Sequence, residues 1–221
     1  FETSYYHEDL YAWHQRHQAG ELGKIVYSEG EYYHYKAFSL PGYNPKTNRV
    51  DAKGWREGLP PQWYPTHSNA YHVGVTGGGF SEVSCLGMPS IVPHLQAENN
   101  VYKNPFGSEV ALFRTREGGM SRMAVCWDLP AASGERGRVY GQKDTHGTTN
   151  TRRPPLPPGV DPGGHGGSHG YLMSEFVDAV LRDRKPWGDV AQALNMTVAG
   201  IVAHQSAIRG GALMKIPHYA L

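Results

Sequence analysis

Residues 108–128 read Ser-Glu-Val-Ala-Leu-Phe-Arg-Thr-Arg-Glu-Gly-Gly-Met-Ser-Arg-Met-Ala-Val-Cys-Trp-Asp. Two runs rich in apolar residues, 108–115 and 120–128, flank Glu117-Gly118-Gly119, which is typical of two strands joined by a hairpin turn. Strands joined by so short a turn pair antiparallel. This stretch therefore predicts an antiparallel sheet at the centre of the fold.

The rest of the chain adds strands and helices to this hairpin. Further strands are predicted at residues 24–35, 80–86 and 136–142, and helices at 5–18, at 66–76, after an N-cap at Ser168, and from Asp189 to Gly210-Gly211. The helices have one apolar face each, so we expect them to cover one face of the sheet. The sequence thus predicts an α+β fold with a largely antiparallel, open-faced sheet, whose uncovered face needs a partner such as a second subunit.

Composition limits the possible partners. The 221 residues are enough for one domain, which we place at residues 1–221, and 21 basic against 20 acidic side chains argue against nucleic acid or an anionic membrane. No stretch approaches ~20 consecutive apolar residues, so no membrane span is expected, and the compartment stays open. Cys85 and Cys126 lie in apolar runs and indicate no disulfide framework.

Several sequence motifs are absent. No Gly-x-Gly-x-x-Gly follows a strand and opens a helix, and the glycine-rich residues 74–79 stand after a predicted helix and before a strand, which is the reverse order. A nucleotide-binding half is therefore not expected in this chain. A Walker sequence, a Gly-x-Ser-x-Gly elbow and a closely spaced Cys/His zinc pattern are missing as well, which excludes nucleotide hydrolysis and serine esterase chemistry.

Residues 163–169, Gly-Gly-His-Gly-Gly-Ser-His, place two imidazoles on a glycine-rich backbone just before a helix. Glycine lets the chain pass close to a ligand, and a helix start offers unpaired N–H donors. The long polar segment 36–62 is of the kind that lines a site, and the 14 tyrosines suit a carbohydrate. A flexible loop that happens to contain two histidines is the alternative.

With these pieces in order, the chain resembles the C-terminal domain of the Gfo/Idh/MocA sugar oxidoreductase family, over nearly its whole length. The matching segments are Gly-Glu-Leu-Gly-Lys-Ile at 20–25, Pro-Thr-His-Ser at 65–68, Gly-Glu-Arg-Gly at 134–137 leading to Gly141, His-Gly-Gly at 165–167, Pro-Trp-Gly-Asp-Val at 186–190, and Gly210-Gly211 to Ile216-Pro217. The resemblance implies a mainly antiparallel sheet with helices on one face, whose open face often forms a dimer contact.

The resemblance also implies chemistry. Family members hold NAD or NADP in an N-terminal Rossmann domain, which also provides a lysine, and neither is present in these residues. A helix-borne histidine commonly acts as acid or base on the sugar hydroxyl, and His67 matches it. Many members have an aspartate one turn earlier, where this chain has Trp63, so the partner of His67 stays open. The Thr-His-Ser and His-Gly-Gly segments look closer to the NAD-dependent glycosidases of the superfamily.

The expected site centres on His67. With an unperturbed pKa of about 6.5, this residue would exchange a proton near neutral pH, and we expect its ring and that of His165 to open onto one pocket. The predicted catalytic residues are His67 and Tyr64, and the predicted substrate-binding residues are His165, His169, His34, Trp63 and Lys36, with no metal ligand. The sequence assigns no role to His7, His14 and His17, and Arg152 and Arg153 are interpreted as a solvated pair.

Three functions remain open. The first is the substrate-binding and catalytic half of a nicotinamide-dependent oxidoreductase, or related glycosidase, acting on a sugar or glycoside, with the NAD or NADP site mainly in another domain. The second is a nucleotide-independent lyase or hydrolase of keto-sugars, in which His34, His67 and His165 could share a divalent metal. The third is a non-catalytic sugar-binding or dimerising module.

Overall fold

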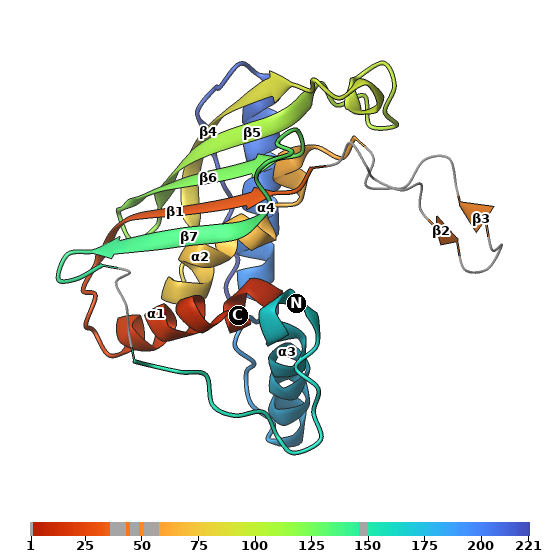
Figure 1. The fold of residues 1–221 in the computed structure, drawn as a ribbon. Coiled ribbons are helices and arrows are strands. Elements are labelled where there is room, and N and C mark those ends of the chain that lie inside the picture. The colour runs from red at the N-terminus through yellow and green to blue at the C-terminus, as the bar shows by residue number, and fades with distance from the viewer. Residues whose placement is uncertain (1, 36–42, 45–48, 51–57, 146–149) are drawn as a thin grey trace.

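The computed structural model describes residues 2–35, 43–44, 49–50, 58–145 and 150–221, and its centre is a six-stranded sheet (Figure 1). The strands follow the order β7-β1-β6-β5-β4-β8, and a separate two-stranded ladder joins β2 to β3. The strands are β1 (Ile25–Tyr33), β2 (Tyr43–Asn44), β3 (Arg49–Val50), β4 (Phe80–Pro89), β5 (Phe106–Thr115), β6 (Met120–Cys126), β7 (Gly134–Gly141) and β8 (Met214–Lys215).

The predicted hairpin is confirmed, and the sheet is largely antiparallel. β5 pairs antiparallel with β6, and the turn between them closes with hydrogen bonds from Thr115 and Gly118. Gly118 takes a φ of +83°, a backbone conformation that favours glycine. One pairing differs: β1 runs parallel to β6, with Tyr27 opposite Met120. Because these strands are far apart in the chain, no short turn sequence predicts their pairing.

Helices cover one face of the sheet (Figure 1). The helices of the described residues are the 3₁₀-helices η1 (Thr3–Tyr6), η2 (Pro61–Trp63) and η3 (Pro93–Leu95), and the α-helices α1 (Glu8–Gln18), α2 (Thr66–Thr76), α3 (Gly164–Leu181) and α4 (Val190–Ile208). α2 and α4 pack on the strands, and α1 packs on α2. α3 departs from the expected layer, because it packs mainly against η1 below the sheet. Among the described residues, no helix combines the length and hydropathy needed to cross a bilayer.

The close approach of α2 to β1 positions the candidate site. A Cβ on Gly30 of β1 would lie 2.2 Å from the Ser68 carbonyl oxygen, so only glycine lets the first turn of α2 rest directly on the strand. The helix itself is buried from His67 to Val75, unlike the amphipathic α1. Its first turn therefore has a fixed position above β1, and His67 lies in that turn.

Two helix starts differ from the sequence prediction. The helix expected at residues 5–18 is divided, because Glu2 caps η1 with a hydrogen bond from the Ser4 amide and His7 is extended before α1 begins. Ser168 is not an N-cap of α3, since its hydroxyl donates to the His165 carbonyl at 2.8 Å. Residues 165–167 instead form a left-handed turn, with φ of +51°, +63° and +81°. A positive φ is unusual for His165, because residues other than glycine rarely take this conformation.

Candidate functional site

His67 lies in the first turn of α2 and is held by two carboxylates. Its Nδ1 atom is 2.9 Å from Glu2 Oε1 and 3.3 Å from Glu135 Oε2. Glu2 precedes η1 and Glu135 belongs to β7, so three distant segments meet at one nitrogen. Ser4 links the two acids, because its hydroxyl contacts Glu2 Oε1 at 2.6 Å, Glu135 Oε2, and His67 Nδ1 at 3.2 Å.

This arrangement changes the protonation of His67. Burial alone would lower the pKa of His67, but hydrogen bonds to Glu135 and Glu2, together with their negative charges, raise it to about 10. Burial would likewise raise the pKa of Glu2, but the hydrogen bond and charge of His67, with help from Ser4 and Thr66, lower it to about 2. At neutral pH the pair is therefore an imidazolium with a carboxylate.

The expectation that His67 keeps an ordinary pKa of about 6.5 is wrong. The raised pKa makes the resting imidazole a proton donor. Nδ1 faces the carboxylates, and in the described part of the chain no hydrogen bond is made to Nε2, so Nε2–H is left for a ligand. The site can thus protonate a carbonyl oxygen directly. It can deprotonate a hydroxyl once the imidazolium has lost a proton.

An aromatic wall stands beside this imidazole. The ring of Tyr32 lies 4.7 Å from that of His67, and the ring of Tyr64 lies 5.4 Å from it. The Tyr32 hydroxyl is 2.9 Å from His34 Nδ1, so Tyr32 lies between the two histidines. The structure therefore brings Tyr64 to His67. His34 is exposed and contacts the Tyr32 ring, which lies between His34 and His67. Tyr32 was not selected from the sequence.

The left-handed turn brings His165 over His67. The two rings stack at 6.1 Å between centroids and 19° between planes, and His165 Nδ1 is 2.7 Å from His169 Nε2. The His67 and His165 rings therefore lie beside each other, but that both open onto one pocket stays a prediction, because the cavity that His165 lines does not include His67. Arg153 fixes the turn: its guanidinium contacts the Gly166 and Tyr6 carbonyls and lies 4.3 Å from the centroid of the Tyr171 ring. Arg153 is thus not half of a solvated pair.

Among the described residues, Trp63 is a predicted site residue that is not brought to His67. The ring of Trp63 makes edge contacts with Tyr102 and His204, at 6.0 and 5.6 Å. It packs beside a different buried pair, in which His204 Nδ1 is 2.6 Å from Glu109 Oε1. Lys36 lies outside the described residues. Their assignment to substrate binding stays a prediction.

The Glu2-His67-Glu135 group has the composition of a metal site. Each side chain offers one ligand atom, all within 4.8 Å of one another, and within the described ranges no other group of three meets this spacing. The expected set of His34, His67 and His165 does not do so. The ligand atom of His67 in this group is Nδ1, which lies at the hydrogen-bond distance of 2.9 Å from Glu2 Oε1. We therefore interpret the group as a proton site.

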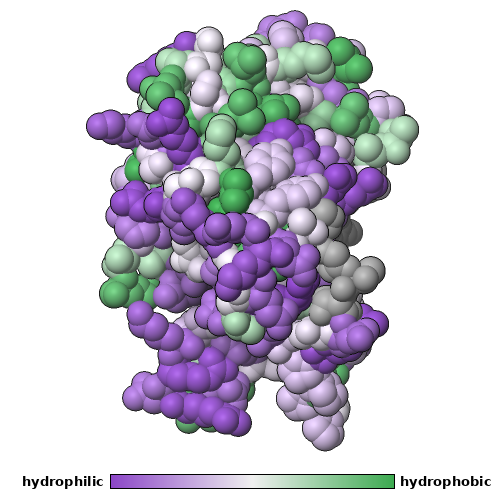
Figure 2. Space-filling view, turned by 90° about the vertical axis from the view of Figure 1, so that its left-hand side faces the viewer, coloured by the Kyte–Doolittle hydropathy of each residue, from purple (hydrophilic) through white to green (hydrophobic). Residues whose placement is uncertain are grey.

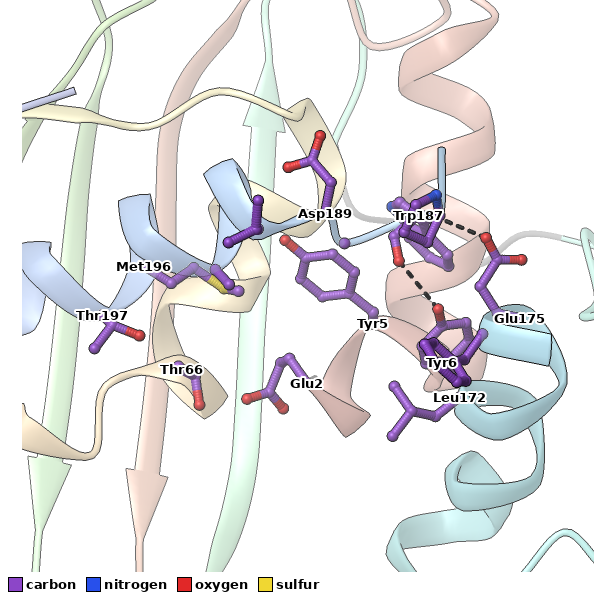
Figure 3. Close-up of a pocket in the computed structure, with 15 residues that line it drawn as sticks. Glu2, Tyr5, Tyr6, Thr66, Leu172, Glu175, Trp187, Asp189, Met196 and Thr197 are labelled. Carbon is purple, nitrogen blue, oxygen red and sulfur yellow. Dashed lines mark hydrogen bonds between the residues drawn. The ribbon is translucent and has the colours of Figure 1, made fainter. Parts of the chain in front are cut away.

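Two cavities flank the group. One of about 380 Å³ is lined by His7, Glu8, Glu135, Arg153, His165 and Gly166. The other, of about 420 Å³, lies on the far side of Glu2 between η1, α3 and α4, and its wall is mostly aromatic and aliphatic (Figure 3). There Tyr5, Tyr6 and Trp187 meet Leu172 and Met196. Glu2 lines this second cavity while its Oε1 atom holds His67.

The carboxylates were missed from sequence because nothing local marks them. Glu2 is 65 residues from His67, and Glu135 belongs to a β-strand that presents charged residues throughout. The one available signal was the Gly134-Glu135-Arg136-Gly137 segment, which was used for the fold and not for the site. His7 was assigned no role, yet its Nε2 atom is 3.2 Å from Glu135 Oε1.

The fold of this chain is similar to that of solved oxidoreductases of the Gfo/Idh/MocA type. Levoglucosan dehydrogenase in complex with NADH and levoglucosan matches with a TM-score of 0.69 and 12% identity, over 98% of this chain and 65% of that chain. An oxidoreductase domain protein from Kribbella flavida matches with a TM-score of 0.68 and 13% identity, over 98% and 65%.

A myo-inositol dehydrogenase from Lactobacillus casei in complex with NAD(H) and myo-inositol matches with a TM-score of 0.62 and 9% identity, over 99% of this chain and 62% of that chain. The chain thus spans slightly less than two thirds of the length of these structures. No protein-family model matches the sequence, and no curated protein is similar to it. Identities this low establish the fold alone.

Proposed function

We propose that this chain is the substrate-binding and acid–base half of a nicotinamide-dependent oxidoreductase acting on a hydroxyl of a sugar or polyol. The observation that carries the proposal is the His67 imidazole, oriented through Nδ1 by Glu2 and Glu135 and presenting Nε2 beside Tyr32 and His165. A buried carboxylate that orients a histidine is a recurrent device for moving a proton to or from oxygen. The sugar and polyol ligands of the similar structures fit this assignment.

The residues act as follows. Tyr32 and Tyr64 offer ring faces to the apolar side of a sugar, and His165 and His169 offer nitrogen donors to its hydroxyls. His67 protonates the carbonyl oxygen in the reductive direction and accepts the hydroxyl proton in the oxidative direction. The nicotinamide, when bound, exchanges the hydride with the same carbon.

We place the nucleotide mainly in a domain other than this one. Within the described residues no strand leads by a short glycine-rich turn directly into a helix, which is the usual cradle for a pyrophosphate. An uncovered surface of this chain suits the packing of a separate domain that would provide this pyrophosphate cradle. α3 exposes an apolar stripe at helical spacing, and the aromatic cavity behind Glu2 adjoins it (Figure 3). The stripe consists of Met173, Phe176, Val177 and Val180.

We place a nucleotide-binding domain on this surface, where it would approach the Glu2 side of the proton site. The choice between NAD and NADP would then belong to that domain. A glycosidase that oxidises, eliminates and reduces again would use the same His67 chemistry, and it remains the narrower form of this proposal.

The open face of the sheet is the proposed contact between subunits. It exposes Leu86, Met88, Val110, Leu112 and Met120. Viewed from the side, hydrophobic atoms gather at the end of the molecule that holds β4 and β5, and the opposite end is mainly hydrophilic (Figure 2). Apolar side chains on an otherwise well-covered domain mark an interaction surface. We infer a homo-oligomer formed through this face.

Ligand titration followed by NMR tests the function on the chain as it is. Levoglucosan and myo-inositol are the probes, and we expect shifts of the ring signals of His67, Tyr32 and His165. The His67→Asn variant should bind more weakly, whereas His14→Phe is the matched control and should bind normally, because His14 lies on α1 with its ring stacked on Trp187. Shifts confined to residues away from His67 would contradict the proposal.

Two further results would favour the alternatives. A stoichiometric divalent metal in the purified protein, whose removal by a chelator lowers the melting temperature, would favour the metal-assisted lyase or hydrolase. Sugar binding that is unaffected by His67→Asn would favour a non-catalytic binding module.

A further inference from the structure

When His67 accepts a proton from the substrate, it must pass a proton on to another group. Nε2 is the nitrogen that a sugar hydroxyl would occupy, so while substrate is bound a proton can leave only through Nδ1. Glu2 also binds Nδ1, but it is 6% exposed, the hydrogen bonds of its Oε1 atom come from Ser4, Thr3 and His67, and the cavity of about 420 Å³ that it lines has a mostly aromatic and aliphatic wall. Glu135 is different, because its second oxygen faces another ionisable group.

That group is His7, which stands in the extended link between η1 and α1. His7 Nε2 is 3.2 Å from Glu135 Oε1, while Glu135 Oε2 is 3.3 Å from His67 Nδ1. The Ser4 hydroxyl bridges His67 and Glu135 as a second, parallel link. His7 also lines the cavity of about 380 Å³, whose volume is ample for water. An unbroken polar chain therefore connects the buried imidazole to an open cavity.

We propose, on the basis of the function proposed above, that Glu135 and His7 form a proton relay that connects His67 to the cavity. The oxidative step starts from the neutral form of His67, in which Nδ1 carries the proton and Nε2 carries none. When the substrate hydroxyl gives its proton to this Nε2, His67 passes the Nδ1 proton to Glu135 Oε2. The carboxyl group turns about its soft terminal torsion and gives the proton to His7 Nε2. His7 releases a proton from Nδ1 to water, so one proton has moved from substrate to solvent, and the electron pair has left as hydride to the nicotinamide.

Exchange of the His67 ring N–H with water, measured by ¹⁵N NMR on the isolated chain, tests the relay without substrate or nucleotide. In His7→Phe we expect the exchange of the Nδ1 proton to slow at least tenfold. The pKa of His67 should change little in this variant, because both carboxylates remain. His14→Phe is again the matched control and should exchange at the wild-type rate.

Chemical rescue separates a relay from a structural role. In His7→Ala, which should also exchange slowly, added imidazole should enter the space left by the missing ring and restore exchange in proportion to its concentration. A second variant, Glu135→Gln, keeps a hydrogen-bonding side chain but cannot carry the proton, and it should exchange slowly and resist rescue. Unchanged exchange in His7→Phe, or slow exchange that imidazole does not restore, would overturn the relay. Neither result bears on whether sugars bind at His67, so the two proposals fail separately.

Discussion

Replacing Glu2 by glutamine should convert His67 from a resting acid into a usable base. The shift of the His67 pKa from 6.5 to about 10 corresponds to roughly 5 kcal/mol of preference for the charged form. At pH 7 only about one molecule in a thousand then has a neutral His67. Glu2→Gln removes the closer of two carboxylates and leaves the desolvation that opposes the charge. We therefore expect the pKa to fall by about two units and the neutral fraction at pH 7 to rise about a hundredfold.

The assay is an NMR titration of the His67 ring C–H signals between pH 5 and 11. Glu8→Gln is the matched control, because Glu8 pairs with Arg153 at 3.3 Å and is half exposed. This control should leave the His67 midpoint in place. A wild-type midpoint near 6.5, or the same high midpoint in Glu2→Gln, would refute the account of the proton site.

The same shift sets the pH dependence of stability. Because the folded pKa of His67 lies above its unfolded value, the native state binds more protons between about pH 6.5 and pH 10. The stabilisation is complete below that window and is lost as the pH rises through it, by roughly 4 kcal/mol between pH 7 and the alkaline limit. Chemical denaturation at pH 7 and pH 10 should show this loss in the wild type and a smaller one in Glu2→Gln. Equal losses would contradict the assignment.

Three further predictions follow from packing. Gly30→Ala should lower the free energy of unfolding by about 3 kcal/mol, because the new Cβ would lie 2.2 Å from the Ser68 carbonyl oxygen. A denaturation curve near that of the wild type would mean that α2 can move away from β1 to make room. Arg153→Met should cost about 2 kcal/mol and speed amide exchange in residues 164–170, and unchanged protection would remove the guanidinium as the brace of that turn. Light scattering should give an oligomer mass for the wild type and a monomer mass for Leu112→Glu. An equal mass for the two proteins would place any contact between subunits elsewhere.

The sheet was predictable where neighbours in sequence are neighbours in space. The β5–β6 hairpin needs only the local signal of Glu117-Gly118-Gly119, and the helices follow from periodicity. The parallel pairing of β1 with β6 joins strands whose partners are separated by more than ninety residues, as in Tyr27 and Met120. It depends on packing of the whole domain, which no short pattern encodes.

The candidate site was predictable only in part, for a related reason. His67 and His165 carry a signal in residue type and local context, and their rings meet. Glu2 and Glu135 are ordinary acidic residues until the fold brings them to Nδ1. Because a pKa is set by such neighbours, the pKa of His67 could not be read from its residue type.

The two buried glutamate–histidine pairs explain how His67 finds a carboxylate although position 63 is Trp63. Glu2 reaches His67 from η1, so α2 and the turn before it need not provide an acid. Position 63 is then free to pack against His204, whose partner Glu109 accepts a hydrogen bond from the Gln62 amide at 2.7 Å. Glu109 is fully buried, and it thereby fixes η2 directly ahead of α2. One pair thus sets the charge of the imidazole, and the other sets the position of the helix that carries it.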